Sequence, residues 1–454
     1  MSIQSEITRL STAKTDIKNA IEGQNVTVPS AASIEDYPDF IMEIGGAIDL
    51  SHRTVFGEIT AKQNTANSYV VSSAGTFKIP LVYGNGIKNS RVNAQAYTRQ
   101  GDTYTADFVN HLGNTLTSPY IEKNTGCTAA SAGLLWQTTS GMISSVSLVS
   151  GLNYRYLQFT IASVPTTNGL AVLWVKDSNG DIMWSWTIWC TTDNLATFTL
   201  TNHTNVEYEM LGLPFGAIWD AGKTHYVVPH YQWGRKDPMV PAAAYNSTSN
   251  MTVYDIAGSA YTGFGTYGVR DDSDAGGTVR SVANSIKMPN KFFLRYSFTT
   301  YNWNNLAYMN NFWNAAETGS STLADDQATA IKTIYDPSPV GYMLQSGRFA
   351  TGFTTTGTSS STASEFNVIG SWANGWTFKK NSTDSTGVFF PAAGYRSGTS
   401  SSLAGMGSYG GWWAYAPHSQ AYVRYLEFGS GNVYPLSYGS RANGFAVWPT
   451  KELN

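Results

Sequence analysis

Charged residues are scarce in this 454-residue chain, at 13% of the sequence, and its 28 basic and 31 acidic residues leave a net charge of −3. Nucleic-acid-binding proteins carry clustered lysine and arginine, so this balance argues against a surface that follows phosphates. Intrinsic disorder needs low hydrophobicity together with high net charge, and neither applies here. The composition predicts a folded protein that does not bind nucleic acid, long enough for about two or three domains.

Cysteine is almost absent, with Cys127 and Cys190 as the two examples. Two cysteines cannot form a disulfide framework or a cysteine-rich zinc site. One disulfide between them and two buried free thiols remain as alternatives. We favour free thiols, because an unpaired cysteine behaves as a small hydrophobic residue.

Long hydrophobic runs are also missing, and no apolar stretch approaches the ~18–20 residues of a membrane-spanning helix. The first residues, MSIQSE, have neither the basic region nor the hydrophobic region of a secretory signal. We therefore expect no membrane insertion and no signal peptide. A surface-active protein of this kind would leave the cell by lysis or within an assembled particle.

Aromatic residues and glycine are abundant, with 14 Trp, 27 Tyr and 43 Gly. This profile is typical of a turn-rich β protein. The strongest local signal is an apolar run at 169–176, the turn Asp-Ser-Asn-Gly at 177–180 and a second apolar run at 181–189, which together predict a hairpin. With further strands expected at 68–72, 77–83, 142–149 and 154–161, residues 47–205 predict an immunoglobulin-like β-sandwich.

The first 46 residues differ from the rest, because their apolar residues recur at spacings of four and three. Lys14 occupies the one missing position of this heptad pattern, a polar interruption of the kind that fixes register in helix bundles. Two to three heptads are too few for a stable isolated helix, so the pattern predicts self-association or docking. A plain amphipathic hairpin packed on the next domain is the alternative. The predicted oligomerisation residues are Ile3, Ile7, Leu10, Ile17 and Ile21.

A second helix is expected after the first one ends near Glu22 and Gly23. The residues Ser33-Ile-Glu-Asp36 form a capping-box pattern that would open it. Its apolar side chains Tyr37, Phe40, Ile41 and Ile44 are expected on one face, and the pair of glycines at 45–46 would end it. Residues 1–46 are therefore predicted as a helical attachment or oligomerisation segment.

The sequence offers little that predicts catalysis. Two G-x-G-x-x-G matches, at 263–268 and 405–410, lack the strand before and the helix after that a dinucleotide site requires. The six histidines form no H-E-x-x-H or His-x-His motif, and no G-x-S-x-G elbow is evident. We expect no enzyme activity.

Acidic residues could supply oxygen ligands to a hard cation at two places, Asp271, Asp272 and Asp274 in one loop and residues 177–181 in the predicted hairpin. A solvated loop and a hairpin turn are the preferred explanations. We predict no metal site and no cofactor, and leave a structural cation such as calcium open.

Residues 206–454 combine polar, Gly/Ser-rich loops and one expected helix near 323–335 with an aromatic-rich C-terminus. Tyrosine and serine on a rigid frame are the residues that binding surfaces use, because tyrosine gives a large contact area at low entropic cost. We expect Tyr409, Tyr415, Tyr434 and Tyr438 to be exposed. In contrast, the core is expected to hold Trp413, Phe428, Phe445 and Trp448.

The N-terminal segment resembles the start of many phage tail and fibre proteins. The matching stretches are ITRL at 7–10, VTVP at 26–29 and YPDFI at 37–41. This resemblance implies attachment to phage tail or baseplate proteins, a homotrimer and a location in the virion.

Residues 206–454 resemble the lectin-like "major paralogous" domains of Bacteroidetes and their phages. The stretches that carry the resemblance are YQWGRKDP at 231–238, DPSPVGY at 336–342, FPAAGYR at 390–396 and RANGFAVWP at 441–449. It implies an α+β C-type-lectin fold related to that of formylglycine-generating enzymes. No cysteine follows position 190, so the resemblance implies binding and not oxidation.

The C-terminus is also similar to the variable proteins of diversity-generating retroelements, in which chosen adenine-rich codons are mutagenised. Framework-like residues alternate here with residues reachable from such codons. The resemblance implies a variable ligand-binding face made of Ser397, Thr399, Tyr409, Gly411, Tyr415, His418, Tyr425, Tyr434, Ser437, Tyr438 and Ser440.

Together these observations predict a mainly β protein with some α, divided into a helical segment (1–46), a β-sandwich (47–205) and a lectin-like domain (206–454). The predicted function is that of a non-enzymatic phage receptor-binding protein that contacts a glycan or protein on the bacterial host surface. One alternative is a fixed cell-surface or fimbria-associated adhesin of a Bacteroidetes bacterium. A glycan-active enzyme is a further alternative, and it would need two carboxylates about 5–10 Å apart in a cleft.

Overall fold

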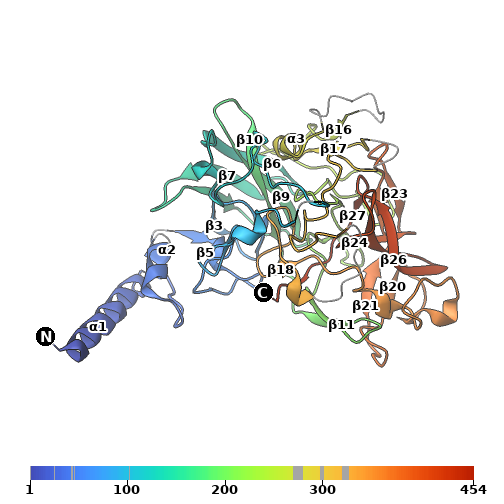
Figure 1. The fold of residues 1–454 in the computed structure, drawn as a ribbon, viewed down its shortest axis with the longest axis horizontal. Coiled ribbons are helices and arrows are strands. Elements are labelled where there is room, and N and C mark those ends of the chain that lie inside the picture. Colours follow the sequence, from blue (N-terminus) through green and yellow to red (C-terminus); the bar gives the residue numbers. More distant parts are fainter. Residues whose placement is uncertain are drawn as a thin grey trace.

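The computed structural model describes residues 2–24, 26–41, 44, 46–101, 103–268, 280–296, 301–319 and 327–453. Strands dominate these residues, which confirms the mainly β prediction. The α-helices of this part of the chain are α1 (Ile3–Glu22), α2 (Tyr37–Ile41) and α3 (Val282–Lys287). Helix α1 projects from one end of the molecule, and the C-terminal strands lie at the other end (Figure 1).

Helix α1 begins and ends where the sequence predicts. Its N-cap Ser2 accepts a hydrogen bond from the backbone N–H of Ser5, and the helix ends at Glu22 before Gly23. The capping box is present as well, because the Ser33 N–H donates to Asp36 Oδ2 at 2.7 Å. It opens a 3₁₀ turn, Ile34–Asp36, that leads into α2.

The second helix does not present its four apolar residues on one buried face. Tyr37 and Phe40 are buried in a small cluster, whereas Ile41 and Ile44 are exposed. The predicted common face is therefore wrong, because α2 has a single buried side and spans only five residues. The rest of the small cluster comes from Ile21, Val26, Val28 and Ala32, with Ile59 and Ala61 packed against it.

Two four-stranded sheets come next in the chain and pack face to face. The predicted hairpin at 169–189 is confirmed by antiparallel pairing of Trp186 with Leu173. Asp177 Oδ1 closes the turn by accepting the N–H groups of Asn179 and Asp181, both at 2.9 Å. The first sheet contains β1 (Ala47–Asp49), β3 (Gly75–Pro80), β8 (Tyr156–Ile161) and β7 (Ile143–Val149) in that order, and the second contains β2 (Ser68–Val71), β10 (Ile182–Cys190), β9 (Gly169–Lys176) and β6 (Ser131–Gln137).

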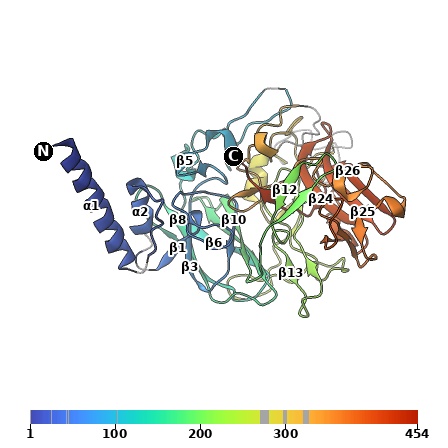
Figure 2. The same ribbon diagram turned by 90° about the horizontal axis from the view of Figure 1, so that it is seen from below.

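The C-terminal part is built on a seven-stranded sheet. Its long strands β24, β25 and β26 are antiparallel neighbours at one end of the molecule (Figures 1 and 2). The spatial order is β15 (Tyr231–Gln232), β27 (Gly444–Phe445), β22 (Ala393–Arg396), β24 (Gly410–Pro417), β25 (Tyr422–Gly429) and β26 (Asn432–Ser440), with β23 (Leu403–Met406) paired to β22.

Smaller sheets complete the described part of the chain. One four-stranded sheet joins β11 (Phe198–Thr201), β12 (Glu207–Met210), β28 (Thr450–Lys451) and β18 (Tyr342–Met343), and one three-stranded sheet joins β19 (Val368–Ile369), β20 (Gly375–Phe378) and β21 (Val388–Pro391). The strand pairs are β4 (Ile87–Lys88) with β5 (Arg91–Val92), β13 (Ile218–Trp219) with β14 (Tyr226–Val227), and β16 (Gly265–Tyr267) with β17 (Lys291–Phe293).

All nine residues of β10 are buried, because both faces of its sheet are covered. On one face, Trp184 stacks on Tyr335 with ring centroids 6.1 Å apart. On the other, Trp189 packs edge-on against Phe215 at 5.4 Å. The two large hydrophobic clusters each contain residues from both sides of position 205, so the predicted ranges 47–205 and 206–454 share their core.

Cys127 and Cys190 are both buried and free, as favoured from the sequence. The expected helix near 323–335 is wrong over its described part. Residues 323–326 lie outside the described residues, and Gln327–Thr329 form a 3₁₀ turn. The backbone then pairs with another segment, because the Ala315 N–H donates to the Ile331 carbonyl and Asn314 bridges to Lys332. Among the helices that the structure describes, none is long and apolar enough to cross a membrane.

Candidate binding surfaces

The residues of the predicted variable face lie on β24, β25, β26 and the turns around them, at the end of the molecule away from α1 (Figure 2). Strand pairing decides which of them share a face. Tyr422 pairs with Ser440 and Arg424 with Tyr438, whereas Tyr425 pairs with Ser437. Side chains opposite one another on paired strands point the same way, so the predicted residues divide into separate groups.

Three of the predicted residues are buried inside the sheet. Tyr415 is 1% exposed, so the expectation that it is exposed is wrong. Tyr425 is buried and stacks on Phe445 at 4.5 Å. Gly411 is buried too, and a Cβ added there would lie 2.4 Å from the Phe445 ring. The cause is that this part of the sheet is covered on both sides, which leaves these positions unable to contact a ligand directly.

A hydrogen-bonded chain runs along the edge of this buried group. The hydroxyls of Tyr409 and Tyr425 are 2.7 Å apart, and Tyr425 donates to Glu427 Oε2 at 2.7 Å. Ser437 donates to the same oxygen at 2.7 Å. Burial raises the pKa of both tyrosines, so both stay protonated and able to donate. Glu427, which the sequence reasoning passed over, thus fixes the positions of three predicted residues.

A second group forms a surface cluster of rings. His418 stacks on Tyr438, and Tyr422 lies 5.4 Å from Tyr438 and 5.0 Å from Tyr301. Ser440 Oγ donates to the carbonyl of Tyr301 at 2.8 Å. Tyr438 is 52% exposed and the other members are half-buried. We call this set, Tyr301, His418, Tyr422, Tyr438 and Ser440, the tyrosine patch.

Sequence reasoning missed two members of the tyrosine patch. Tyr422 could have been found, because it alternates with Arg424 along a strand and faces the same side as Tyr438. Tyr301 carries no such signal, since it comes from a segment far away in the sequence. The pKa of His418 is lowered by burial and by the nearby Arg424 guanidinium, so its ring stays neutral at neutral pH.

The remaining predicted residues flank these groups. Ser397 and Thr399 share a hydrogen bond of 3.0 Å in the turn after β22, and the N–H of Gly398 between them donates to Asn443 Oδ1 at 2.9 Å. Tyr434 is half-buried, with its hydroxyl 2.9 Å from Ser361 Oγ. The expected core residues are all buried as predicted, namely Trp413, Phe428, Phe445 and Trp448.

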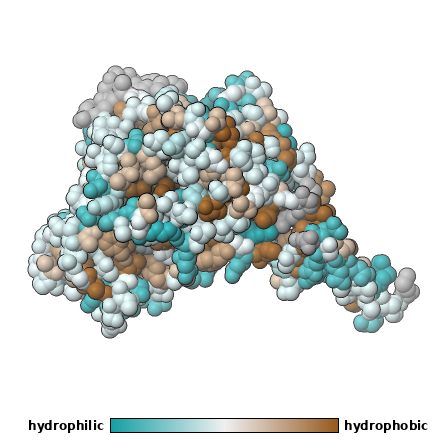
Figure 3. All heavy atoms as spheres, turned by 180° about the vertical axis from the view of Figure 1, so that it is seen from behind, coloured by the Kyte–Doolittle hydropathy of each residue, from teal (hydrophilic) through white to brown (hydrophobic). Residues whose placement is uncertain are grey.

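Helix α1 carries the other candidate surface. Ile3 is 83% exposed, and the next three predicted seam residues are exposed as well, whereas Ile21 is buried against α2. Lys14, the polar interruption, lies 6.0 Å from the ring of Tyr37. From behind, the helix projects from the body with hydrophilic residues dominating the face in view (Figure 3). The apolar stripe of Ile3, Ile7, Leu10 and Ile17 therefore has no partner within the described part of the chain.

One buried constellation has the residue types of a catalytic triad. Cys127 Sγ lies 3.9 Å from His111 Nδ1, and His111 Nε2 lies 3.4 Å from Asp177 Oδ2. Burial raises the pKa of Cys127 and lowers that of His111, which keeps both neutral. A nucleophilic cysteine needs the opposite shifts and access to substrate. These three residues are buried, so they stabilise the core.

Possible cation ligands give no site among the residues described by the structure, where no group of three His, Cys, Asp or Glu side chains converges. Asp177 is used in the hairpin turn, as preferred from the sequence. Asp271, Asp272 and Asp274 lie outside the described residues.

Comparisons with protein-family models, with curated proteins and with solved structures found no match. The resemblances to phage tail proteins and to lectin-like domains therefore stay predictions. Any functional conclusion has to rest on the residues and their geometry.

Proposed function

We propose that this chain is a non-enzymatic receptor-binding protein of a phage tail. In this proposal α1 attaches and trimerises the protein at the tail, and the end that carries the tyrosine patch contacts a glycan or protein of the bacterial host. The function belongs to binding, because stacked, partly exposed tyrosines are suited to flat contacts with sugar rings or protein surfaces.

The observation that carries this proposal is the separation of two unlike surfaces. The unpartnered apolar stripe lies on a projecting helix at one end, and the tyrosine patch lies on the strands at the opposite end (Figures 1 and 2). A protein that is held at one end and presents aromatic side chains at the other fits an attachment role. Several copies bound together would multiply weak single contacts into firm adhesion.

The self-association step is tested by the molar mass of the full-length protein in light scattering. We expect a trimer for the wild type and a smaller species for the double variant Ile7→Glu/Leu10→Glu, because two charges would enter the apolar stripe. Ser11→Glu, at an exposed polar position of the same helix, is the matched control and should leave the mass unchanged. A monomeric wild type would contradict the trimer.

The location is tested with an antibody against the purified protein. Gold labelling at the tails of phage particles in a lysate is the expected result. Labelling of bacterial cell surfaces with bare particles would favour the alternative, a fixed adhesin of the bacterium.

A further inference from the structure

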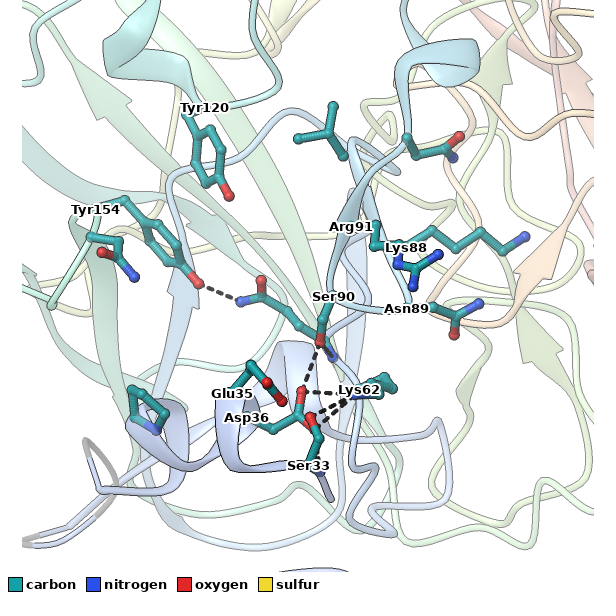
Figure 4. A pocket seen from close by; sticks show the side chains of 15 residues that line it. Ser33, Glu35, Asp36, Lys62, Lys88, Asn89, Ser90, Arg91, Tyr120 and Tyr154 are labelled. Atoms are coloured by element: carbon teal, nitrogen blue, oxygen red, sulfur yellow. Dashed lines mark hydrogen bonds and ion pairs between the residues drawn. The ribbon is translucent and has the colours of Figure 1, made fainter. Parts of the chain in front are cut away.

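The largest hollow of the described structure lies where residues 33–38 meet the body, far from the tyrosine patch. It has a volume of about 950 Å³. Figure 4 shows Tyr120 and Tyr154 on one side, Lys88 and Arg91 on the other, and Asp36 at the base. Ligand pockets in proteins occupy about 300–1,000 Å³, so this hollow could hold a molecule of several rings.

The base of the hollow is rigidly built. Lys62 Nζ lies 2.8 Å from Asp36 Oδ2, and Ser90 Oγ donates to Asp36 Oδ1 at 3.3 Å. Ser90 also accepts the N–H of Gln63 at 2.9 Å. Asn89 and Ser90 adopt positive φ values of 52° and 61°, which form the tight turn between β4 and β5. The wall is thus set before any ligand arrives.

Aromatic rings form the opposite wall. Tyr120 and Tyr154 lie with their centroids 5.2 Å apart and their planes tilted by 31°. The Tyr154 hydroxyl accepts a hydrogen bond from Gln63 Nε2 at 2.7 Å, which fixes the ring relative to the base. Neighbouring rings held at fixed angles offer C–H-rich sugar faces a surface to pack against.

The charges that line the hollow are balanced. Lys62 pairs with Asp36, Lys88 pairs with Glu452 just outside, and Arg91 and Glu35 carry one charge of each sign. A polyanion would therefore meet as many carboxylates as cations. Pro38 and Val92 are the aliphatic residues among the lining, so an apolar ligand would find few partners. Amides complete the surface, with Asn89, Asn93, Asn153 and Gln63 offering both donors and acceptors.

We propose that this hollow, which we call the seam site, binds a neutral oligosaccharide. The rings of Tyr120 and Tyr154 pack against sugar faces, and the amides and Arg91 bind hydroxyls. It would be a second binding site, separate from the surface proposed to contact the host. Because residues 33–38 supply one wall, an occupied seam site also holds the N-terminal segment against the body.

The seam site is suited to binding and not to hydrolysis. Glycoside cleavage needs one carboxyl with a raised pKa that acts as the acid. Burial acts to raise the pKa of Asp36, but hydrogen bonds from Lys62 and Ser33 outweigh it and lower the pKa. A hydrogen bond from its own backbone N–H, and another from Ser33, lower the pKa of Glu35. Both carboxyls are therefore ionised at neutral pH.

The experiment is saturation-transfer NMR and calorimetry on the full-length chain. The neutral probes are maltotriose, cellotriose and triacetylchitotriose, and trigalacturonate is the anionic probe. We expect at least one neutral probe to bind at millimolar concentrations or below, and to bind more tightly than trigalacturonate. Asn153→Ala should weaken binding about fivefold, the cost of one ordinary hydrogen bond. Asn153→Trp should abolish binding by filling the hollow.

The matched controls separate this site from its surroundings and from the proposed function. Leu152→Ala changes the exposed neighbour, which does not line the hollow, and should bind as the wild type does. Tyr438→Ala removes the centre of the tyrosine patch and should leave trisaccharide binding intact. The proposal is overturned if no neutral probe binds, if only trigalacturonate binds, or if Asn153→Trp binds normally. It is also overturned if Asn153→Trp changes the molar mass and no sugar binds, since the hollow would then be a subunit interface.

Discussion

The imidazole ring of His418 stacks on the phenol ring of Tyr438, with centroids 4.1 Å apart and planes 28° from parallel. The contact joins the turn after β24 to the strand β26 and leaves half of Tyr438 in solvent. A ring supported in this way loses little entropy when a ligand covers it, which makes Tyr438 the centre of the tyrosine patch.

The first prediction concerns Tyr438. Tyr438→Ala should abolish or strongly reduce adhesion of labelled protein to bacterial cells that the wild type binds. Its unfolding free energy should change by less than about 0.5 kcal/mol, because the ring is exposed. Flow cytometry of cells and thermal unfolding of the protein measure the two effects. Full adhesion by this variant would remove the patch from the contact.

The second prediction concerns natural variation. Deep sequencing of the 3′ end of the gene across a propagated population should show substitutions at the exposed positions Tyr438, Ser440 and His418. Gly411, Tyr415 and Tyr425 should stay constant, because their side chains or spaces are buried in the sheet. Uniform sequence, with no nearby template copy, would contradict diversification and leave a fixed binding surface.

The third prediction is the cost of filling Gly411. Gly411→Ala places a methyl group against Phe445 and should destabilise the fold by about 1–3 kcal/mol, the usual penalty for overpacking. Gly431→Ala is the matched control, since nothing lies within 4 Å of an added Cβ there. Urea unfolding should show a lower midpoint for the first variant only. Equal midpoints would mean that Phe445 moves aside at little cost.

The fourth prediction is a loss of stability in acid caused by His230. Burial, together with the Arg396 guanidinium, lowers the pKa of this histidine to about 3. The unfolded chain takes up the proton near pH 6.5, so stability falls as the pH drops from about 6.5 toward 3. At pH 4 the loss should be on the order of 2–4 kcal/mol.

His230→Gln is the variant that tests this origin. Glutamine keeps a donor for the Ala393 carbonyl, which His230 Nε2 reaches at 2.9 Å, but has no proton to gain. Its unfolding free energy should depend less on pH between 6.5 and 4 than that of the wild type. Parallel curves for the two proteins would place the acid sensitivity elsewhere.

The fifth prediction concerns the ion pair that ties the N-terminal segment to the body. Lys62→Met leaves the buried Asp36 without its cation, at a cost of about 1–3 kcal/mol for the docked segment. Since the folded pKa of Asp36 is lowered, this stabilisation is present above the ordinary value of 3.8 and is lost as the pH falls below it.

Limited proteolysis between α1 and β1 gives the readout for Lys62→Met. The variant should be cut faster than the wild type at pH 7, and the wild type should approach the rate of the variant in acid. Arg91→Met, at an exposed cation nearby, should be cut at the wild-type rate. Equal rates for all three proteins would show that other contacts hold the segment.

Local features were predictable because their causes are local. Helix α1 is explained by the spacing of its apolar residues and ends before Gly23, and the hairpin of β9 and β10 is explained by one Asn-Gly turn between two apolar runs. Long-range features were not predictable. A sequence pattern could not show that Tyr301 lies beside Tyr422, or that residues after Gln327 pair with the segment near Asn314.

The candidate site was predicted in part for the same reason. A tyrosine on a strand points to one of two faces, and its exposure depends on what covers that face. Tyr438 and Tyr415 look alike in the sequence, yet one is exposed and the other lies under neighbouring chain. The resemblance supplied the candidate region, and the strand register decided which residues reach the surface.

The two-sided burial of β10 has a consequence for how this protein can evolve and be engineered. Trp184 and Trp189 belong to different hydrophobic clusters, and both clusters need residues from before and after position 205. Exchanging the C-terminal half as a cassette, by recombination or by design, would strip apolar cover from the strand and leave the recipient insoluble. New specificities must therefore arise by point substitution on the existing strands.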